Sequence, residues 1–330
     1  MSKFIVITSI FAPTEAVIKF SREQDYQLIV VGDKKTPPNW VCENVTYLSV
    51  EHQAQLGFEL NQHLPYNHYC RKMLGYLYAL THKADVIIDT DDDNIPNENW
   101  CFPAFMGTYQ VLPEDLGFIN IYELYTNQKI WPRGYPLKYL NTDRTVTQQG
   151  MIDQQVKVGI WQGLANEDPD VDAIYRLTSD KMCIFQDNGS YVLGKNTITP
   201  FNSQNTAFCK ELFALLYLPS FVTFRFTDIL RGLVAQPIMW LYNFNLGFLN
   251  ATVTQKRNPH DYMKDFESEI PMYLYADRII ELITPSLSAS QSIEDNLYVA
   301  YEQLQRVNIV SNQEMKTLEV WLSDYKAHCG

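Results

Sequence analysis

Four aspartates stand within five positions of one another, directly after an apolar run. The stretch VIIDTDDDN, residues 86–94, places Asp89, Asp91, Asp92 and Asp93 after three β-branched residues. Carboxylates this close repel one another unless water or a cation screens them. Mg²⁺ and Mn²⁺ prefer carboxylate oxygens, and Mg²⁺ commonly takes one or two of them together with phosphate oxygens. The cluster therefore predicts a partial metal site, with Asp91 and Asp93 projecting the same way from an extended segment.

A solvated turn is the alternative explanation of the same cluster. Asn94 and Pro96 are typical residues of turns and strand ends, and an Asx-turn there would account for part of the acidity. A calcium loop of the EF-hand type does not fit, because its glycine and its final glutamate would be misplaced. The residues alone leave the metal site and the turn open.

The elements before the cluster alternate between strand and helix. Short β-branched runs at 4–7 and 27–31 flank residues 14–23, which have helical spacing behind an N-cap at Thr14. Residues 66–83 have the apolar spacing of an amphipathic helix, and 86–88 form the next strand. This order predicts an α/β domain with a mostly parallel sheet flanked by helices. Ligands bind such sheets at the carboxyl ends of the strands, where the aspartates stand.

The rest of the chain continues the mixed pattern and then becomes helical. We expect strands at 116–124, 173–178 and 246–255, a short helix at 210–218, and a helix at 226–243 with Pro237 near its C-terminal end. The periodicity changes near residue 270. This predicts one domain over residues 1–270 and a C-terminal helical extension, residues 271–330, packed on it.

Composition restricts the class of protein. The 330 residues are 46% hydrophobic and 19% charged, with a net charge of −12, which argues against disorder and against a general nucleic-acid binder. The six cysteines form no CxxC pair, as in reduced thiols of a cytosolic protein. No apolar run is long enough to span a bilayer. We expect a soluble, cytoplasmic protein, with peripheral membrane association and oligomeric state left open.

Basic residues near the predicted strand ends suit a phosphate-bearing ligand. VVGDKKTP, residues 30–37, supplies Asp33 and Lys34 for a nucleotide's base and ribose, and an ordinary polar loop is the alternative. Arg71 and Lys72 precede the aspartate strand and could reach a diphosphate, although a solvated helix face explains them equally well. Arg133 lies between prolines in the aromatic loop WPRGYPL.

Two later segments carry more charge than a core needs. NEDPDVDAIYRLT contains Asp170 and Asp172, and FRFTDILRG places Arg225, Asp228 and Arg231 three residues apart in an apolar stretch. On one helix face, such charges must be paired with each other or must face a cleft. Both an internal ion-pair network and a catalytic site remain open at this stage.

Six stretches together resemble the STELLO-type glycosyltransferase-like family, whose core resembles a GT-A nucleotide-sugar transferase. They occur in the family's order between about residues 3 and 270: IIDTDDDN, WPRGYPL, NEDPDVDAIYRLT, PFNSQNTAF, RFTDILRGLVAQPIMW and QKRNPHDYMKDFESE. The resemblance implies a GT-A-like, Rossmann-type fold with a metal-binding Asp-x-Asp. By position, Asp91 and Asp93 are the implied ligands of Mn²⁺ or Mg²⁺. His260, which on its own could equally be structural, matches the place of a further ligand.

The leading hypothesis is a metal-dependent glycosyltransferase with a nucleotide-sugar donor and a glycan or other hydroxyl acceptor. If the reaction inverts the sugar, Asp228 is the first choice of general base, with Asp170 and Asp172 as second choices; if it retains, no such base is required. The residues expected to bind the donor are Asp33, Lys34, Arg71, Lys72, Asp92, Arg133 and Arg231.

Two rival functions share parts of this pattern. A sugar nucleotidyltransferase would use a similar sheet and acidic site, but TSIFAPTEA after the first strand has neither glycine nor a base. A catalytically silent scaffold that binds a glycan or a partner would keep the fold, yet it has no need to hold repelling carboxylates together. The products formed would separate the three classes.

Overall fold

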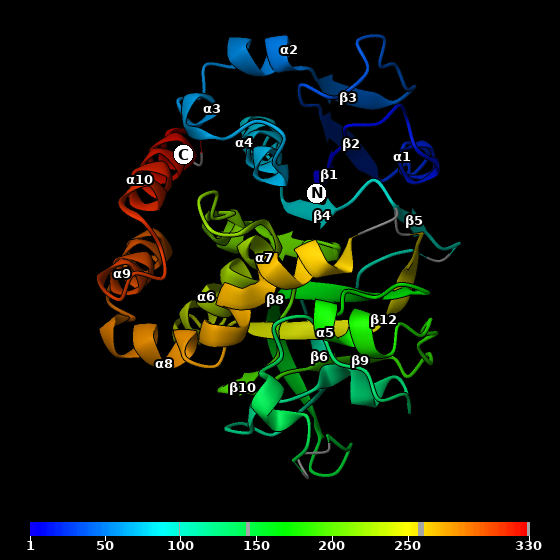
Figure 1. Ribbon diagram of the computed structural model, residues 1–330, viewed down its shortest axis with the longest axis vertical. Coiled ribbons are helices and arrows are strands. Elements are labelled where there is room, and N and C mark those ends of the chain that lie inside the picture. The colour runs from blue at the N-terminus through cyan, green and yellow to red at the C-terminus, as the bar shows by residue number, and fades with distance from the viewer. Residues whose placement is uncertain (99, 143–145, 257–260, 329–330) are drawn as a thin grey trace.

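The computed structural model describes residues 1–98, 100–142, 146–256 and 261–328 (Figure 1). Its centre is a ten-stranded sheet in the order β3-β2-β1-β4-β11-β8-β6-β9-β12-β5, and β7 (Gly117–Phe118) pairs separately with β10 (Thr197–Ile198). The strands of the large sheet are β1 (Lys3–Thr8), β2 (Tyr26–Val31), β3 (Val45–Leu48), β4 (Val86–Thr90), β5 (Asn94–Pro96), β6 (Met106–Val111), β8 (Ile152–Asn166), β9 (Ser190–Val192), β11 (Asn205–Cys209) and β12 (Asn245–Gln255).

The first four strands of the sheet are parallel. β1 pairs in parallel with β2 and β4, and β2 with β3. Beyond β4 the pairing is mixed: β11 runs antiparallel to β4 and β8, whereas β12 runs parallel to β8. The predicted α/β class, with a large sheet flanked by helices, is confirmed, and its run of four adjacent parallel strands lies in the N-terminal half.

Both faces of the parallel strands are buried, which explains their continuous apolar runs. Alternate residues face opposite sides: Phe4 and Val6 belong to one core, and Ile5 and Ile7 to the other. Helix α4 (Lys72–Thr81) covers the first side and α1 (Glu15–Phe20) the second. Close packing of α4 requires Gly75, since a Cβ there would lie 2.5 Å from Val6 Cγ1.

The predicted helices before the aspartates are confirmed. Thr14 caps α1 by accepting from the backbone N–H of Val17 at 3.3 Å. The stretch expected at 66–83 forms the 3-10 helix η1 (Tyr69–Arg71) and then α4. Two further helices, α2 (Val50–Gln55) and α3 (Leu60–His63), lie in the connection between β3 and η1.

Two predicted strands are wrong. Residues 173–178 form helix α5 (Ala173–Thr178), because the Asp172 carboxylate accepts from the Tyr175 N–H at 2.8 Å and so starts a helix. Residues 116–124 contain only β7 before the 3-10 helix η2 (Ile121–Leu124), where the Asn120 side chain accepts from the N–H of Tyr122. Local side-chain capping outweighs the β-branched and aromatic composition in both places.

The later helices follow the predicted pattern. The short helix expected at 210–218 is the 3-10 helix η4 (Lys210–Leu216), and the long one is α6 (Thr227–Leu241), preceded by the 3-10 helix η5 (Phe224–Phe226). Helix α7 (Tyr262–Tyr275) crosses residue 270, the predicted domain boundary, and that division stays a prediction. The remaining helices are η3 (Leu137–Tyr139), α8 (Ile279–Ile283), η6 (Thr284–Ser286), α9 (Ile293–Arg306) and α10 (Asn312–His328).

The last helices pack against the N-terminal half of the chain. In Figure 1, α10 lies beside α3 and α4, and these elements are in contact.

The Glu314 carboxylate is fully buried and accepts from the N–H groups of Ser220 (3.1 Å) and Phe221 (2.6 Å) and from the Tyr217 hydroxyl. None of the helices described is long and apolar enough to cross a membrane.

Candidate active site

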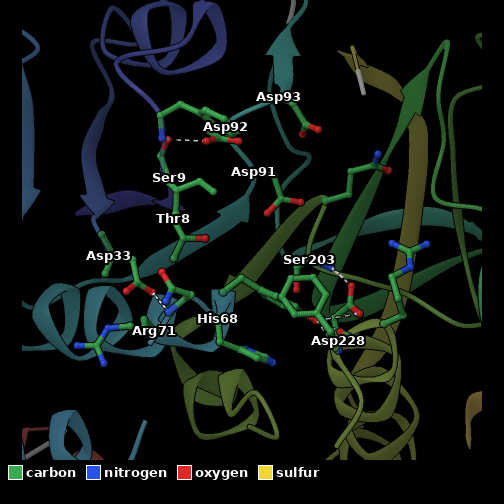
Figure 2. A pocket seen from close by; sticks show the side chains of 18 of the residues that line it. Thr8, Ser9, Asp33, His68, Arg71, Asp91, Asp92, Asp93, Ser203 and Asp228 are labelled. Atoms are coloured by element: carbon green, nitrogen blue, oxygen red, sulfur yellow. Dashed lines mark hydrogen bonds between the residues drawn. The ribbon is translucent and has the colours of Figure 1, made fainter. Parts of the chain in front are cut away.

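A pocket of about 300 Å³ opens at the carboxyl ends of β1, β2 and β4. Side chains from both halves of the sheet enter it, as Figure 2 shows: Asp91 and Asp93 project between the pair Ser9 and Asp92 on one side and Ser203 and Asp228 on the other. This is the place where open α/β sheets bind ligands, as the sequence predicts.

The four aspartates are divided between two environments. β4 runs through Asp89 and Thr90, so Asp89 faces the same core as Ile87 and is fully buried. There it contacts Lys72 Nζ at 2.8 Å and the Arg231 guanidinium at 2.7 Å, from α4 and α6. Asp89 is thus a charge-paired core residue, and the pocket receives the other three carboxylates.

Asp91 is joined to the buried core by one of its two oxygens. Lys72 Nζ donates to Asp91 Oδ1, Asp89 Oδ1 and the Thr90 carbonyl, each at 2.8 Å. The pKa of Asp91 is raised to about 7, first by desolvation and then by Asp93 and Asp89, against the opposing charge of Lys72. The three oxygens that accept from Lys72 use all three of its N–H donors. Lys72 therefore affects the site through its contact with Asp91, and it does not line the pocket.

Neutral side chains donate hydrogen bonds to the other two carboxylates of the turn. Asp93 Oδ2 accepts from Gln255 Nε2 at 3.1 Å, at the end of β12. Asp92 accepts from the Ser9 hydroxyl after β1, and burial raises its pKa to about 6. The carbonyl of Asp92 accepts from the Thr14 hydroxyl at 2.6 Å, which joins the turn to the start of α1.

Residue Gln204, just before β11, braces the acidic turn at both ends. Its carbonyl accepts from Thr90 Oγ1 at 2.7 Å and from Asn94 Nδ2 at 2.8 Å, one on each side of the three aspartates. Its side-chain amide donates to Gln255 Oε1, and Gln255 in turn holds Asp93. The orientation of the turn is therefore set by a strand more than 100 residues away in the chain.

On the other side of the turn lies an ion-pair network centred on Arg133. Its guanidinium donates to both oxygens of Asp170 at 2.8 Å and to Asp228 Oδ2 at 2.9 Å. Asn202 donates to Asp170 at 2.7 Å, and the N–H of Ser203 donates to Asp228 at 3.2 Å. Hence the segment 202–204 contacts both the acidic turn and the Arg133 network.

The network changes the expected role of Asp228. Although burial opposes ionisation, Arg133 and the neighbouring arginines lower the pKa of Asp228 to about 2. A general base works best with a pKa near the working pH, so this carboxylate is a weak base at neutral pH. Asp170 is held by Arg133 in the same way and also lines the pocket. Asp228 accepts further hydrogen bonds from the Tyr69 hydroxyl and from the backbone of Ile229 and Ser203, so both of its oxygens are engaged within the protein, and Asp170 is the one better placed to accept from a ligand hydroxyl.

The predicted nucleotide residues lie at the ends of β1 and β2. Asp33 and Arg71 line the pocket. The Asp33 carboxylate accepts from the N–H groups of Lys34 (2.7 Å) and Asn67 (2.6 Å), and Arg71 donates to Gln53 Oε1 at 3.0 Å. The Lys34 side chain lies 3.8 Å from the Tyr66 ring centroid, outside the pocket lining.

Two other predicted residues lie away from the pocket. Arg231 donates to Asp89, to the Asn202 carbonyl (3.0 Å) and to Ser203 Oγ (3.1 Å) beneath the site. Asp172 is fully buried, caps α5 and accepts from Trp131 Nε1 at 2.6 Å. His260, the expected third metal ligand, lies outside the described residues.

The carboxylates of the turn fit a hard divalent cation. Asp91 and Asp93 line one pocket, and Lys72 occupies only Oδ1 of Asp91. Over the described part of the chain, no three His, Cys, Asp or Glu side chains are grouped to hold a metal by themselves. A partial shell of two carboxylates is what Mg²⁺ takes when phosphates complete its coordination.

Several residues that line the pocket are not among the site residues predicted from the sequence. His68, Tyr69 and Phe224 form an aromatic wall, with the rings of Tyr69 and Phe224 centred 4.8 Å apart. Gln204 was within the stretch PFNSQNTAF, which carried no chemical assignment, and Gln255 ended a predicted strand. Polar residues at the ends of strands were the available signal for these two glutamines. The sequence gives no signal that the aromatic residues line a pocket, because aromatic residues suit a hydrophobic core equally well.

Comparisons with known proteins point to one family. A family model described as STELLO glycosyltransferases matches residues 225–329. Two Arabidopsis thaliana proteins, "Probable glycosyltransferase STELLO1" and "Probable glycosyltransferase STELLO2", are each 26% identical over 98% of this chain and 44% of their own length. The chain thus spans less than half the length of these relatives.

Among solved structures, glucosyl-3-phosphoglycerate synthase from Mycobacterium tuberculosis in complex with phosphoglyceric acid is matched over 86% of this chain and 79% of its own, with 11% identity and a TM-score of 0.34. The sequence comparisons carry the conclusion. Along almost its whole length the chain resembles the STELLO glycosyltransferases, which confirms the family resemblance expected from the sequence.

Proposed function

We propose that this chain is a glycosyltransferase that moves a sugar from a nucleotide-activated donor to a hydroxyl of a glycan or similar acceptor, with Mn²⁺ or Mg²⁺ on Asp91 and Asp93. One observation carries the proposal: these two carboxylates project together into the pocket at the carboxyl ends of parallel strands. The resemblance to proteins named as probable glycosyltransferases supports the reaction class.

The charge of the pocket supports a need for a cation. Among the described residues, six carboxylates line it, against three guanidinium groups, and two of those guanidiniums are ion-paired with carboxylates of the protein. A diphosphate entering this pocket alone would be repelled. Asp91 and Asp93 would hold a divalent cation here, which would offset the repulsion and would supply the positive charge that stabilises the leaving nucleotide.

The chain's own residues would divide the remaining tasks. The ends of β1 and β2, with Ser9, Asp33 and Arg71, offer polar contacts for the nucleoside part of the donor. Asp170, fixed by Arg133, offers an acceptor for a sugar hydroxyl, and Asp228 holds Arg133 and the Tyr69 hydroxyl beside it. Because the pKa of Asp228 is lowered, Asp228 orients its neighbours in this scheme, and proton removal from the acceptor is not assigned to it.

The proposal is tested by a thermal-shift screen of UDP- and GDP-sugars, with Mn²⁺ or with EDTA. A donor at about 100 times its Kd adds about 2.7 kcal/mol of stability, which raises Tm measurably. We expect stabilisation only with Mn²⁺, and its loss in Asp93→Asn. Asp85→Asn is the matched control, since Asp85 lies at the opposite end of β4 with surface partners.

Product analysis then separates the reaction classes. A glycosyltransferase releases a nucleoside diphosphate or monophosphate when the acceptor is supplied, whereas a sugar nucleotidyltransferase releases pyrophosphate. If no nucleotide sugar stabilises the wild-type protein with either metal, the proposal is wrong and a binding scaffold becomes the better explanation.

A further inference from the structure

His68 is an imidazole in the pocket whose proton position is fixed by the backbone. It precedes η1, and its Nδ1 accepts from the N–H of Cys70 at 3.1 Å, as an N-cap does. A nitrogen that accepts a hydrogen bond carries no proton, so in the neutral ring the proton is on Nε2. The ring therefore presents an N–H donor at Nε2.

Two aromatic neighbours hold the ring in place. Tyr69 stacks on it with centroids 5.2 Å apart and planes 14° apart, and Phe224 meets it edge-on at 4.9 Å. Burial lowers the pKa of His68 to about 4, against the opposing effect of Asp33, so the ring is neutral at pH 7. His68 Nε2–H is therefore a fixed, uncharged hydrogen-bond donor.

Nothing in the described part of the chain accepts this hydrogen bond. The hydrogen bonds of the structure use only Nδ1 of the ring, and His68 lines the pocket, so Nε2–H is available to a ligand. Among the described residues that line the pocket, carboxylates outnumber guanidinium groups, so an uncharged N–H donor such as His68 Nε2 offers a ligand oxygen a partner that adds no charge.

The position of the aromatic wall indicates which part of the ligand His68 contacts. Tyr69 joins the aromatic wall to the Arg133 network, in which Asp170 is the acceptor proposed for a sugar hydroxyl, because the Tyr69 hydroxyl donates to Asp228 Oδ1 at 3.3 Å. Phe224 is 49% exposed and presents an apolar face beside Arg225 and Asp228. An apolar ring face next to hydrogen-bonding groups matches a sugar, which has apolar C–H faces and polar edges.

On the assumption of the proposed function, we propose that His68 Nε2–H donates to an oxygen of the glycosyl group of the bound donor, and that it helps to select that group. His68 then acts as a neutral specificity-determining residue, separate from the carboxylates that hold the cation.

The capping role and the binding role can be separated by two substitutions. In His68→Asn, the short amide oxygen can still accept from the Cys70 N–H, whereas the donor at the Nε2 position is lost. In His68→Gln, the longer amide can place an N–H near the Nε2 position, whereas the cap is weakened. Kd is measured with Mn²⁺ by calorimetry for matched pairs: UDP-glucose against UDP, and GDP-mannose against GDP.

We expect His68→Asn to weaken the binding of the preferred nucleotide sugar about 3- to 10-fold, the size of one neutral hydrogen bond, with little change for its nucleoside diphosphate. His68→Gln should recover part of the loss. Unchanged Kd values in His68→Asn would show that His68 acts only as the cap of η1. An equal loss of affinity for the nucleotide sugar and for its nucleoside diphosphate would show that His68 contacts the diphosphate. Either result overturns the inference. If the wild-type protein is folded but binds no nucleotide sugar, the proposed function is wrong. The present inference, which rests on it, is then wrong as well.

Discussion

Asp89 and Asp93 stand four residues apart, yet the protein treats them as different kinds of group. Asp89 lies in the strand, has no exposed surface and contacts two cationic side chains. Asp93 lies beyond the strand, reaches the pocket and is held by the neutral amide of Gln255. The comparison separates a buried carboxylate, whose charge is balanced by Lys72 and Arg231, from a carboxylate that a ligand in the pocket can reach.

The buried side should determine stability, and Asp89→Ala tests this most strongly. Removing Asp89 leaves Lys72 and Arg231 without their shared buried partner, so we expect the free energy of unfolding to fall by about 3–5 kcal/mol. Urea unfolding followed by circular dichroism measures the loss.

Asp85→Ala is the matched control for this comparison. Its ion-pair partners are the N-terminal amine and Lys210, at 4.0 and 3.8 Å on the surface, where such pairs contribute about 0–1 kcal/mol, and it also accepts from the Ser2 N–H at 2.8 Å. Equal losses in the two variants would contradict the division between a buried and a pocket-facing group.

The pocket side should determine metal affinity, and Gln255→Leu tests this without removing a carboxylate. Loss of a side chain that orients a metal ligand typically costs 10- to 100-fold in metal affinity, and we expect an effect of about that size on Mn²⁺ binding. Titration of Mn²⁺ in the presence of a nucleoside diphosphate, followed by electron paramagnetic resonance, gives the Kd.

Gln128→Leu is the corresponding control, since the Gln128 amide donates to the Met182 carbonyl on the surface. The Kd for Mn²⁺ should be the same in this variant and in the wild type. A normal Kd in Gln255→Leu as well would show that Asp93 does not depend on its amide partner.

The smallest effect on ligand binding is expected at Asp172, the acidic residue that the sequence placed among the candidates for catalysis. Asparagine can keep the helix cap on the Tyr175 N–H, but its amide NH₂ group then faces the buried Trp131 Nε1–H, which loses its acceptor. Asp172→Asn should therefore lower the free energy of unfolding by about 1–3 kcal/mol and leave the Kd for a nucleotide sugar unchanged. Asp170→Asn should weaken that binding, because it breaks the pair with Arg133. If Asp172→Asn were the more damaging of the two for binding, the assignment of Asp172 as a helix cap would be wrong.

Local patterns predicted the elements better than the contacts between them. Thr14 as a cap, the helix after residue 66 and the strand before the aspartates all follow from short-range periodicity. The signal for α5 was also present, since Asp172 is a typical N-cap, but the composition of residues 173–178 favoured a strand.

The partners of the site residues could not be predicted in the same way. β11 lies between β4 and β8, and that sheet order brings Gln204 to the aspartates. No spacing in the chain encodes it. For the same reason, Arg133 was expected to bind phosphate, whereas Asp170 and Asp228 neutralise it from distant segments.

The buried Glu314 has a consequence for the order in which the protein is made. Its carboxylate fixes the backbone of Ser220 and Phe221, which lead directly to Phe224 in the pocket wall. While the chain emerges from the ribosome, the acidic turn is synthesised more than 200 residues before α10. Until α10 docks, two backbone N–H groups next to the wall lack their acceptor, so the pocket is completed only after α10 has been synthesised and has packed on the rest of the chain.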